Sequence, residues 1–266
     1  MFSKPLLKAT IKQNYIVFII ILAVMMLYLP TIISLYNPVS QESLNDMMKM
    51  LPKQMISAMG FSDAGTTLLG FIASYYYGFL ILLLPMIYTI IVANRSIASH
   101  VDKGSMAYLL STPNTRIKIA MTQALYLLVT ITLLLGIVTA FGISICQIMF
   151  PGDLNVKGFL ILNAGALLLY YAVTGIGFFA SSLFNETKSS LAIGAGLPVA
   201  FLVLQMISNA GDKTEFFKYF TLFTLFDTTK ITSGEGYGLS FLILALIAVV
   251  MYTTSIIVFK KRDLPL

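Results

Sequence analysis

The sequence predicts an all-α polytopic membrane protein with six transmembrane helices and both termini in the cytoplasm. Hydrophobic residues make up 58% of the 266 positions and charged residues 11%, which is about half the charged fraction of a soluble domain. The mean hydropathy is +0.89. The apolar residues also form blocks long enough to cross roughly 30 Å of hydrocarbon, and the Lys and Arg residues are distributed unevenly between the connections. Composition, block length and charge distribution together predict this fold class.

A window of about 19 residues finds six apolar blocks, which we interpret as a single transmembrane domain over residues 1–266. The predicted spans are 15–36, 68–93, 119–145, 158–184, 190–208 and 239–259. Because the number of spans is even, both termini lie on the same side of the membrane.

The Lys and Arg residues predict which side this is. Eleven of them lie in the N-terminal segment, the second and fourth connections and the C-terminal tail, whereas six lie in the other connections. Positive charges near span ends favour the cytoplasmic side, so this distribution places both termini in the cytoplasm. We interpret the net charge of +6 as a topology signal and expect no nucleic-acid partner.

The first outer connection, residues 37–67, is rich in methionine. It contains Met47, Met48, Met50, Met55 and Met59. We interpret these side chains as the apolar face of an interfacial helix. Because thioethers adapt to varied apolar partners and are soft ligands, a loose lid over a hydrophobic substrate and a Cu(I) site are the alternatives.

The second span contains three consecutive tyrosines, Tyr75, Tyr76 and Tyr77. They are candidates for the lining of a solute path through the membrane. Close packing between helices is the alternative interpretation, as it is for the glycines of spans four and five.

The connection between spans two and three predicts a short amphipathic helix. Met106, Leu109 and Leu110 fall at i, i+3 and i+4 and form one apolar stripe. Asp102 stands near the start of this run, where a carboxylate favours the helix dipole. Pro113 ends the run, because the residue before a proline is pushed out of the α region. Such a helix in an inward loop is either a membrane-surface element or a contact for a partner.

The last outer connection predicts a segment that dips into the outer leaflet. Six aromatic residues lie within 11 positions, and Lys residues flank them. They are Phe216, Phe217, Tyr219, Phe220, Phe223 and Phe226. Anchoring in the membrane and contact with substrate are both open for this segment.

The chain carries no signature of a catalytic or metal centre. No Asp, Glu, Lys, Arg or His lies inside a predicted span, which argues against proton-driven transport and against an intramembrane hydrolase, although Na⁺ sites made of carbonyls and hydroxyls stay open. The single Cys146 and single His100 lack the partners that a metal site needs. No phosphate-binding loop occurs. We therefore expect no catalytic residues, no metal and no cofactor in this chain.

Three stretches resemble the ABC-2 type (type V exporter) permease subunits of ABC transporters. The first is DKGSMAYLLSTPNTR, residues 102–116, which is similar to that family's cytoplasmic segment with its acidic residue, Gly-Thr, Leu-Leu pair, Pro and Ser-Arg. The second is LFTLFD, residues 222–227, which resembles the outer re-entrant segment before the last span. The third is the basic tail FKKRDL, residues 259–264. Ser105 and Gln123 depart from the residues common in the family.

The resemblance implies a coupling helix that sits in a groove of a cytosolic ATPase. Its contact residues would be Asp102, Gly104, Met106, Leu109, Leu110, Pro113 and Arg116, with the two leucines as apolar knobs. The re-entrant segment would include Phe220, Phe223, Phe226 and Asp227.

The function implied is that of the membrane subunit of an ATP-driven exporter in a bacterial cell membrane. Two ATPase subunits would hold ATP and Mg²⁺, and a second copy of this chain or a sister permease would complete the assembly. The solute would be hydrophobic or amphipathic, with peptide, antibiotic and lipid-like cargo all open. The alternative is a stand-alone channel or ion-coupled secondary transporter without an ATPase partner.

Overall fold

The computed structural model describes residues 2–36, 52–60, 67–112 and 114–264, and within these ranges it contains helices and no strand. Six helical units are long and apolar enough to cross a membrane. They are α1 (Lys4–Ser34), the unit formed by α4 (Leu68–Tyr75), the π-helical turn η1 (Tyr76–Leu80) and α5 (Ile81–Ser96), then α8 (Arg116–Met149), α9 (Val156–Leu183), α10 (Thr187–Asn209) and α12 (Tyr237–Lys261). The predicted all-α, six-span fold class is confirmed.

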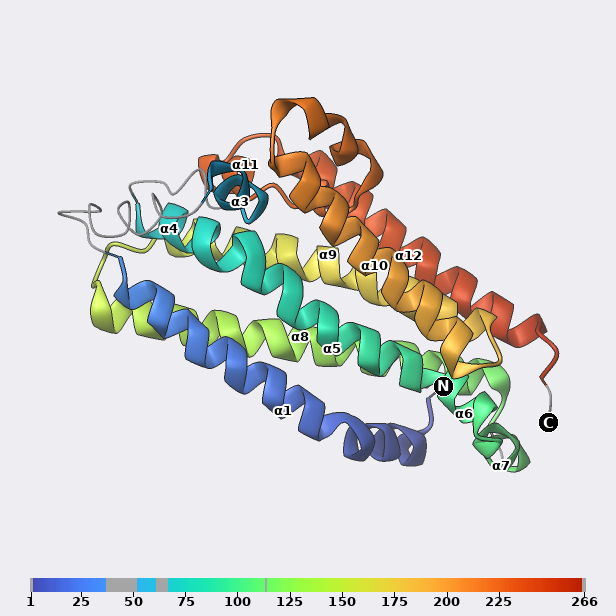
Figure 1. The fold of residues 1–266 in the computed structure, drawn as a ribbon. Helices are drawn as coiled ribbons and strands as arrows, with labels where there is room; N and C mark the ends of the chain where they lie inside the picture. Colours follow the sequence, from blue (N-terminus) through green and yellow to red (C-terminus); the bar gives the residue numbers. More distant parts are fainter. Residues whose placement is uncertain (1, 37–51, 61–66, 113, 265–266) are drawn as a thin grey trace.

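Short helices lie at the two ends of this bundle (Figure 1). One end carries α6 (Ala98–Asp102) and α7 (Ser105–Ser111), together with the first and last described residues. We call it the α6–α7 end. The opposite end carries α3 (Lys53–Ala58), the 3₁₀ segments η2 (Asp212–Phe220) and η3 (Phe223–Leu225), and α11 (Thr228–Ser233). We call it the α3–α11 end.

Several helices extend well beyond the apolar blocks that predict them. The first predicted span begins at residue 15, but α1 begins at Lys4. The 34 residues of α8 measure about 51 Å at 1.5 Å per residue. The polar first turn of α8 is stabilised by a cap, since the Thr115 side chain accepts a hydrogen bond from the Lys118 amide. Helical structure therefore continues past the hydrocarbon on the α6–α7 end.

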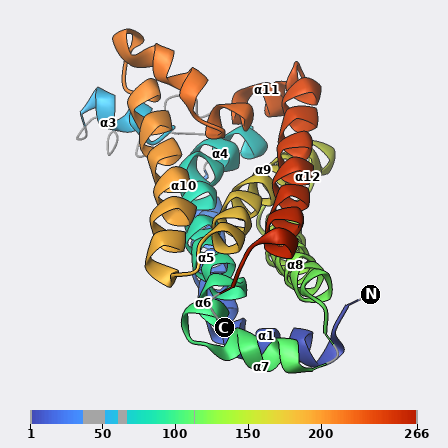
Figure 2. The ribbon, with the colours of Figure 1, turned by 90° about the vertical axis from the view of Figure 1, so that its right-hand side faces the viewer.

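Helix α9 lies at the centre of the bundle, between α10 and α12 (Figure 2). Within its most apolar stretch 67% of residues are buried, compared with 22% for α1, α10 and α12. It packs against α5, α8, α10 and α12. Small residues make this position possible: a Cβ added at Gly177 would lie 2.8 Å from the Ala93 Cβ of α5, so the two backbones approach closely only because Gly177 has no side chain.

Candidate functional site

The α6–α7 element begins at a break in the second spanning unit. Helix α5 ends at Ser96, and Ile97 departs from helical geometry with φ −130° and ψ −56°. The hydroxyl of Ser181 on α9 accepts hydrogen bonds from the amides of Ile97 and Ala98, at 3.2 and 2.9 Å. Since Ser181 is fully buried, a buried hydroxyl of the central helix holds this break in place.

Two short helices replace the single helix that the sequence predicts here. Asp102 is the last residue of α6, and Gly104 separates it from α7 with φ +69°, a left-handed conformation that glycine adopts without strain. The Asp102 carboxylate accepts a hydrogen bond of 3.3 Å from the Thr187 amide at the start of α10. Asp102 thus lies two residues before the N-cap of α7, and its carboxylate faces the N-terminus of α10, where a negative charge is favourable.

His100 and Ser105 join the two short helices across the turn. The Nδ1 atom of His100 lies 3.0 Å from the Ser105 hydroxyl, which also donates to the His100 carbonyl oxygen at 3.2 Å. Burial, and after it the charge of Lys103, lowers the pKa of His100. The imidazole is therefore held in its neutral form, which suits a structural role in the turn.

Helix α7 turns its apolar stripe toward the bundle and a different face toward solvent. Met106 is fully buried, and Leu109 and Leu110 are half-buried against the hydrophobic core. Tyr108 is 79% exposed, and Ala107 and Ser111 are exposed beside it. Pro113 lies outside the described residues.

Arg116 and Arg262 join the start of α8 to the chain that leaves α12. The Arg116 guanidinium donates to the carbonyl oxygen of Arg262. Arg262 in turn donates to the carbonyl oxygens of Ser182 and Phe184, at 2.6 and 2.9 Å, which would otherwise be unpaired at the C-terminus of α9. Burial and the neighbouring Arg116 lower the pKa of Arg262. Arg116 thus has an internal partner at this end of the bundle.

The three tyrosines of the second unit take different positions. Tyr75 is half-buried, with its ring centroid 4.6 Å from that of Phe71. Tyr76 is fully buried and donates to the Met25 carbonyl oxygen of α1 at 3.2 Å. Tyr77 is fully buried, donates to Asn163 Oδ1 at 2.8 Å, and lines a pocket. Among the three, Tyr77 alone contributes to that pocket.

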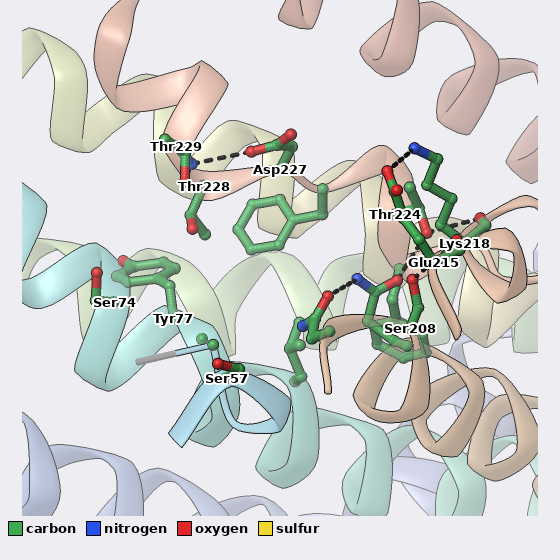
Figure 3. Close-up of a pocket in the computed structure, with 17 residues that line it drawn as sticks. Ser57, Ser74, Tyr77, Ser208, Glu215, Lys218, Thr224, Asp227, Thr228 and Thr229 are labelled. Atoms are coloured by element: carbon green, nitrogen blue, oxygen red, sulfur yellow. Dashed lines mark hydrogen bonds and ion pairs between the residues drawn. The ribbon is translucent and has the colours of Figure 1, made fainter. Parts of the chain in front are cut away.

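The pocket lies at the α3–α11 end and measures about 320 Å³. Residues from α3, α4, η1, α5, α10, η2, η3 and α11 line it, and Figure 3 shows their side chains converging. Two residues of the predicted re-entrant segment, Phe223 and Phe226, are buried in its wall, whereas Phe220 is 62% exposed. Asp227 also lines the pocket and caps α11 by accepting from the Thr229 and Lys230 amides.

Sequence reasoning missed several of these residues. Ser181 left no signal in the sequence, because one serine among the small residues of a span is unremarkable. Tyr108 left a weak one, an aromatic residue opposite the apolar stripe of α7. Gln205 and Asn209 also line the pocket. They form an amide pair four residues apart at the end of α10, which was a readable signal of a polar site.

The described residues include no cluster of metal-binding side chains. In the described part of the chain, no three His, Cys, Asp or Glu residues come close enough to hold a metal ion. Cys146 is a buried free thiol. The structure thus places two short helices at one end of the helical bundle and a polar pocket at the other.

The comparison with protein families agrees with this arrangement. The model of the ABC-2 family transporter protein matches residues 6–264, which include nearly the whole of all six spanning units, while no curated protein matches the chain. The predicted membership of the ABC-2 family is thereby confirmed. This chain belongs to the ABC-2 family of transporter proteins, the membrane components of ABC transporters.

Proposed function

We propose that this chain is the membrane subunit of an ATP-driven exporter that moves a hydrophobic or amphipathic solute out of a bacterial cell. Two separate cytosolic subunits bind ATP and Mg²⁺, hydrolyse the nucleotide and dock at the α6–α7 end. A second copy of this chain or a sister permease completes the membrane part. The chain itself supplies the path and the docking element.

The observation that supports this proposal most directly is the two-sided character of α7. The face of α7 that packs against the bundle consists of the buried Met106 and the half-buried Leu109 and Leu110. These contacts fix α7 to the bundle. Its outer face presents Tyr108, an amphipathic residue type that is enriched among the residues that dominate binding energy. An element that transmits movement needs both an accessible face and a fixed one, and α7 has both.

Three spanning units hold α6 in place. The chain connects α6 directly to α5, Ser181 binds it to α9, and Asp102 binds it to α10. A displacement of α6 and α7 by a docked ATPase would therefore move these units as one body. This makes the element a transmission point for movement that a partner drives.

The docking role is tested by a charge on the exposed face. We expect Tyr108→Asp to weaken ATPase binding by about 30-fold or more, the equivalent of a hot-spot loss of about 2 kcal/mol. The matched control is Tyr219→Asp, because Tyr219 is 80% exposed at the α3–α11 end. The test is purification of tagged chain from its native host, followed by mass spectrometry and an ATPase assay of the eluate.

Two outcomes would contradict the proposal. One is that the wild-type chain carries no ATPase subunit, which would favour a stand-alone channel or ion-coupled carrier. The other is that Tyr108→Asp retains as much ATPase as Tyr219→Asp while both variants melt at the wild-type temperature. Leu109 and Leu110 are less suitable positions for this test, since their side chains also pack against the core.

A further inference from the structure

The charged residues among the described lining of the pocket at the α3–α11 end are Glu215, Lys218 and Asp227. Glu215 and Lys218 form an ion pair on η2 at 2.5 Å, and Lys218 lowers the pKa of Glu215 through this hydrogen bond. The Asp227 carboxylate accepts two backbone amides and lies 3.4 Å from the Lys230 ammonium group. Among the described lining residues, every charged side chain is thus paired with a group of opposite charge on its own segment.

Uncharged amides and hydroxyls make up most of the remaining polar lining. On one wall, the Thr224 hydroxyl donates to Gln205 Oε1 at 2.7 Å, and Gln205 Nε2 donates to Asn209 Oδ1 at 3.1 Å. These two hydrogen bonds leave Asn209 Nδ2 and the second hydrogen of Gln205 Nε2 available as donors. On the facing wall, the hydroxyls of Thr228 and Thr229 have no partner within the described part of the chain.

Aromatic rings form the apolar side of the same pocket. Tyr77 and Phe226 lie with their ring centroids 6.4 Å apart, and Phe223 lines the pocket beside them. The Tyr77 hydroxyl is directed to Asn163 and its ring is fully buried, so Tyr77 supports the wall of the pocket from behind. Ring surface together with a few placed hydrogen-bonding groups is the usual composition of a small-molecule site.

A close backbone contact shapes the wall between α3 and the π-helical turn. Gly60 at the end of α3 and Gly78 of η1 both line the pocket, and a Cβ at Gly78 would lie 3.1 Å from the Met59 carbonyl oxygen. A side chain at position 78 would therefore require a small shift of the α3 backbone. A volume of about 320 Å³ is at the lower end of the range of about 300–1,000 Å³ that small-molecule sites occupy, so the pocket suits a headgroup or a single ring.

We propose that this pocket binds an uncharged polar group that carries hydroxyls or amides. The group is either a free neutral solute or the head of an amphipathic molecule. Its hydrogen-bonding groups contact Gln205, Asn209 and Thr228, in front of the wall that the buried rings of Tyr77 and Phe223 support. The pocket's role as a station for exported cargo rests on the proposed function, whereas the binding chemistry stands on the geometry alone.

The test uses the full chain in lipid nanodiscs without any ATPase, so its result is independent of the docking experiment. Isothermal titration compares five probes, with empty nanodiscs as the blank. Hexyl β-glucoside carries a hydroxylated headgroup on an alkyl chain, and methyl β-glucoside is the corresponding free solute, so the two distinguish these ligand sources. N-acetyl-leucine amide tests whether the pocket binds amides. Hexyl phosphate and hexylammonium carry the same chain with a negative or a positive charge.

We expect at least one neutral probe to bind at least tenfold more tightly than both charged probes. Gln205→Leu, which removes the central amide of the wall, should weaken that neutral probe by about tenfold. The matched control is Gln147→Leu, because Gln147 is exposed on α8 away from the pocket. If Gln205→Leu fails to fold, Asn209→Leu provides the same comparison, because Asn209 is exposed and is the second amide assigned to the ligand.

The proposal is overturned if a charged probe binds as tightly as the neutral ones, if no neutral probe binds above the blank, or if a folded Gln205→Leu or Asn209→Leu variant binds the neutral probe as the wild type does. None of these results would affect ATPase association at the α6–α7 end. Conversely, a result that contradicts the docking proposal would not change the affinity measured for the neutral probe.

Discussion

At the scale of single residues, two adjacent serines of α9 differ sharply in what their hydroxyls do. Ser181 accepts hydrogen bonds from the amides of Ile97 and Ala98 at the break between α5 and α6. The hydroxyl of Ser182 is equally buried but has no hydrogen-bond partner within the described residues. A buried donor that loses its partner carries the full desolvation penalty, whereas removal of an unpaired hydroxyl carries none.

This difference makes a prediction about stability. Ser181→Ala should lower the free energy of unfolding by about 1–3 kcal/mol, because it leaves buried amides unpaired. Ser182→Ala, on the same helix and one residue away, should leave the free energy of unfolding unchanged or slightly raised. Thermal unfolding of both variants in nanodiscs measures the two effects. Equal melting temperatures for Ser181→Ala and the wild type would show that water or a backbone shift replaces the hydroxyl.

Some features of α7 could be predicted from the sequence at the level of single residues, and others could not. The stripe of Met106, Leu109 and Leu110 was readable, because helical periodicity depends only on spacing. The direction of that stripe was not, because an apolar face suits its own bundle as well as a partner protein. In the structure, the stripe packs against the helical bundle and Tyr108 is exposed. Which residue meets a partner depends on tertiary packing, which periodicity does not contain.

At the scale of elements, the six spans were predictable and their ends were not. Hydropathy detects apolar blocks, so it found all six units, but helices such as α1 continue into polar turns that it does not detect. The π-helical turn η1 left no sequence signal either. It inserts one extra residue into a helical turn, and it places Gly78 against α3 and Tyr77 in the pocket. The pocket therefore depends on a local irregularity that spacing rules do not predict.

The sequence also does not show which glycines lie at close helix crossings, and the structure leads to a second prediction about two of them. Gly177 and Gly196 both lie in apolar spans, and the sequence does not distinguish them. A Cβ at Gly177 would lie 2.8 Å from the Ala93 Cβ, whereas a Cβ at Gly196 would meet nothing within 4 Å. Gly177→Ala should therefore destabilise the bundle by about 1–3 kcal/mol through overpacking. Gly196→Ala should stabilise it by up to about 1 kcal/mol, because alanine favours a helix interior.

Melting temperatures of the two glycine variants in the same nanodiscs decide this comparison. The substitutions are chemically identical, so general effects of alanine on helix propensity cancel between them. A stable Gly177→Ala variant would mean that α5 and α9 can separate at this crossing without loss, and that the central helix is less tightly constrained than its burial indicates.

At the scale of the whole molecule, the charge distribution and the fold describe the same two ends. The structure brings the start of α1, the α6–α7 element and the end of α12 to one end of the bundle (Figure 1). These are the segments that carry most of the eleven basic residues assigned inward. The second spanning unit joins this end to the pocket, since α4 and η1 line the pocket and α5 leads into α6.

The orientation of this molecule in the membrane is the last prediction. Positive charges near span ends favour the cytoplasm, so Lys103, between α6 and α7, should face inward and Lys213, on η2, outward; both are exposed. In intact cells, a membrane-impermeant maleimide should label Lys213→Cys but label Lys103→Cys only after lysis. The native Cys146 is buried and should give little background, which the wild-type chain measures. Labelling of Lys103→Cys in intact cells would place α7 outside, where no cytosolic ATPase reaches it, and would remove the basis of the docking proposal.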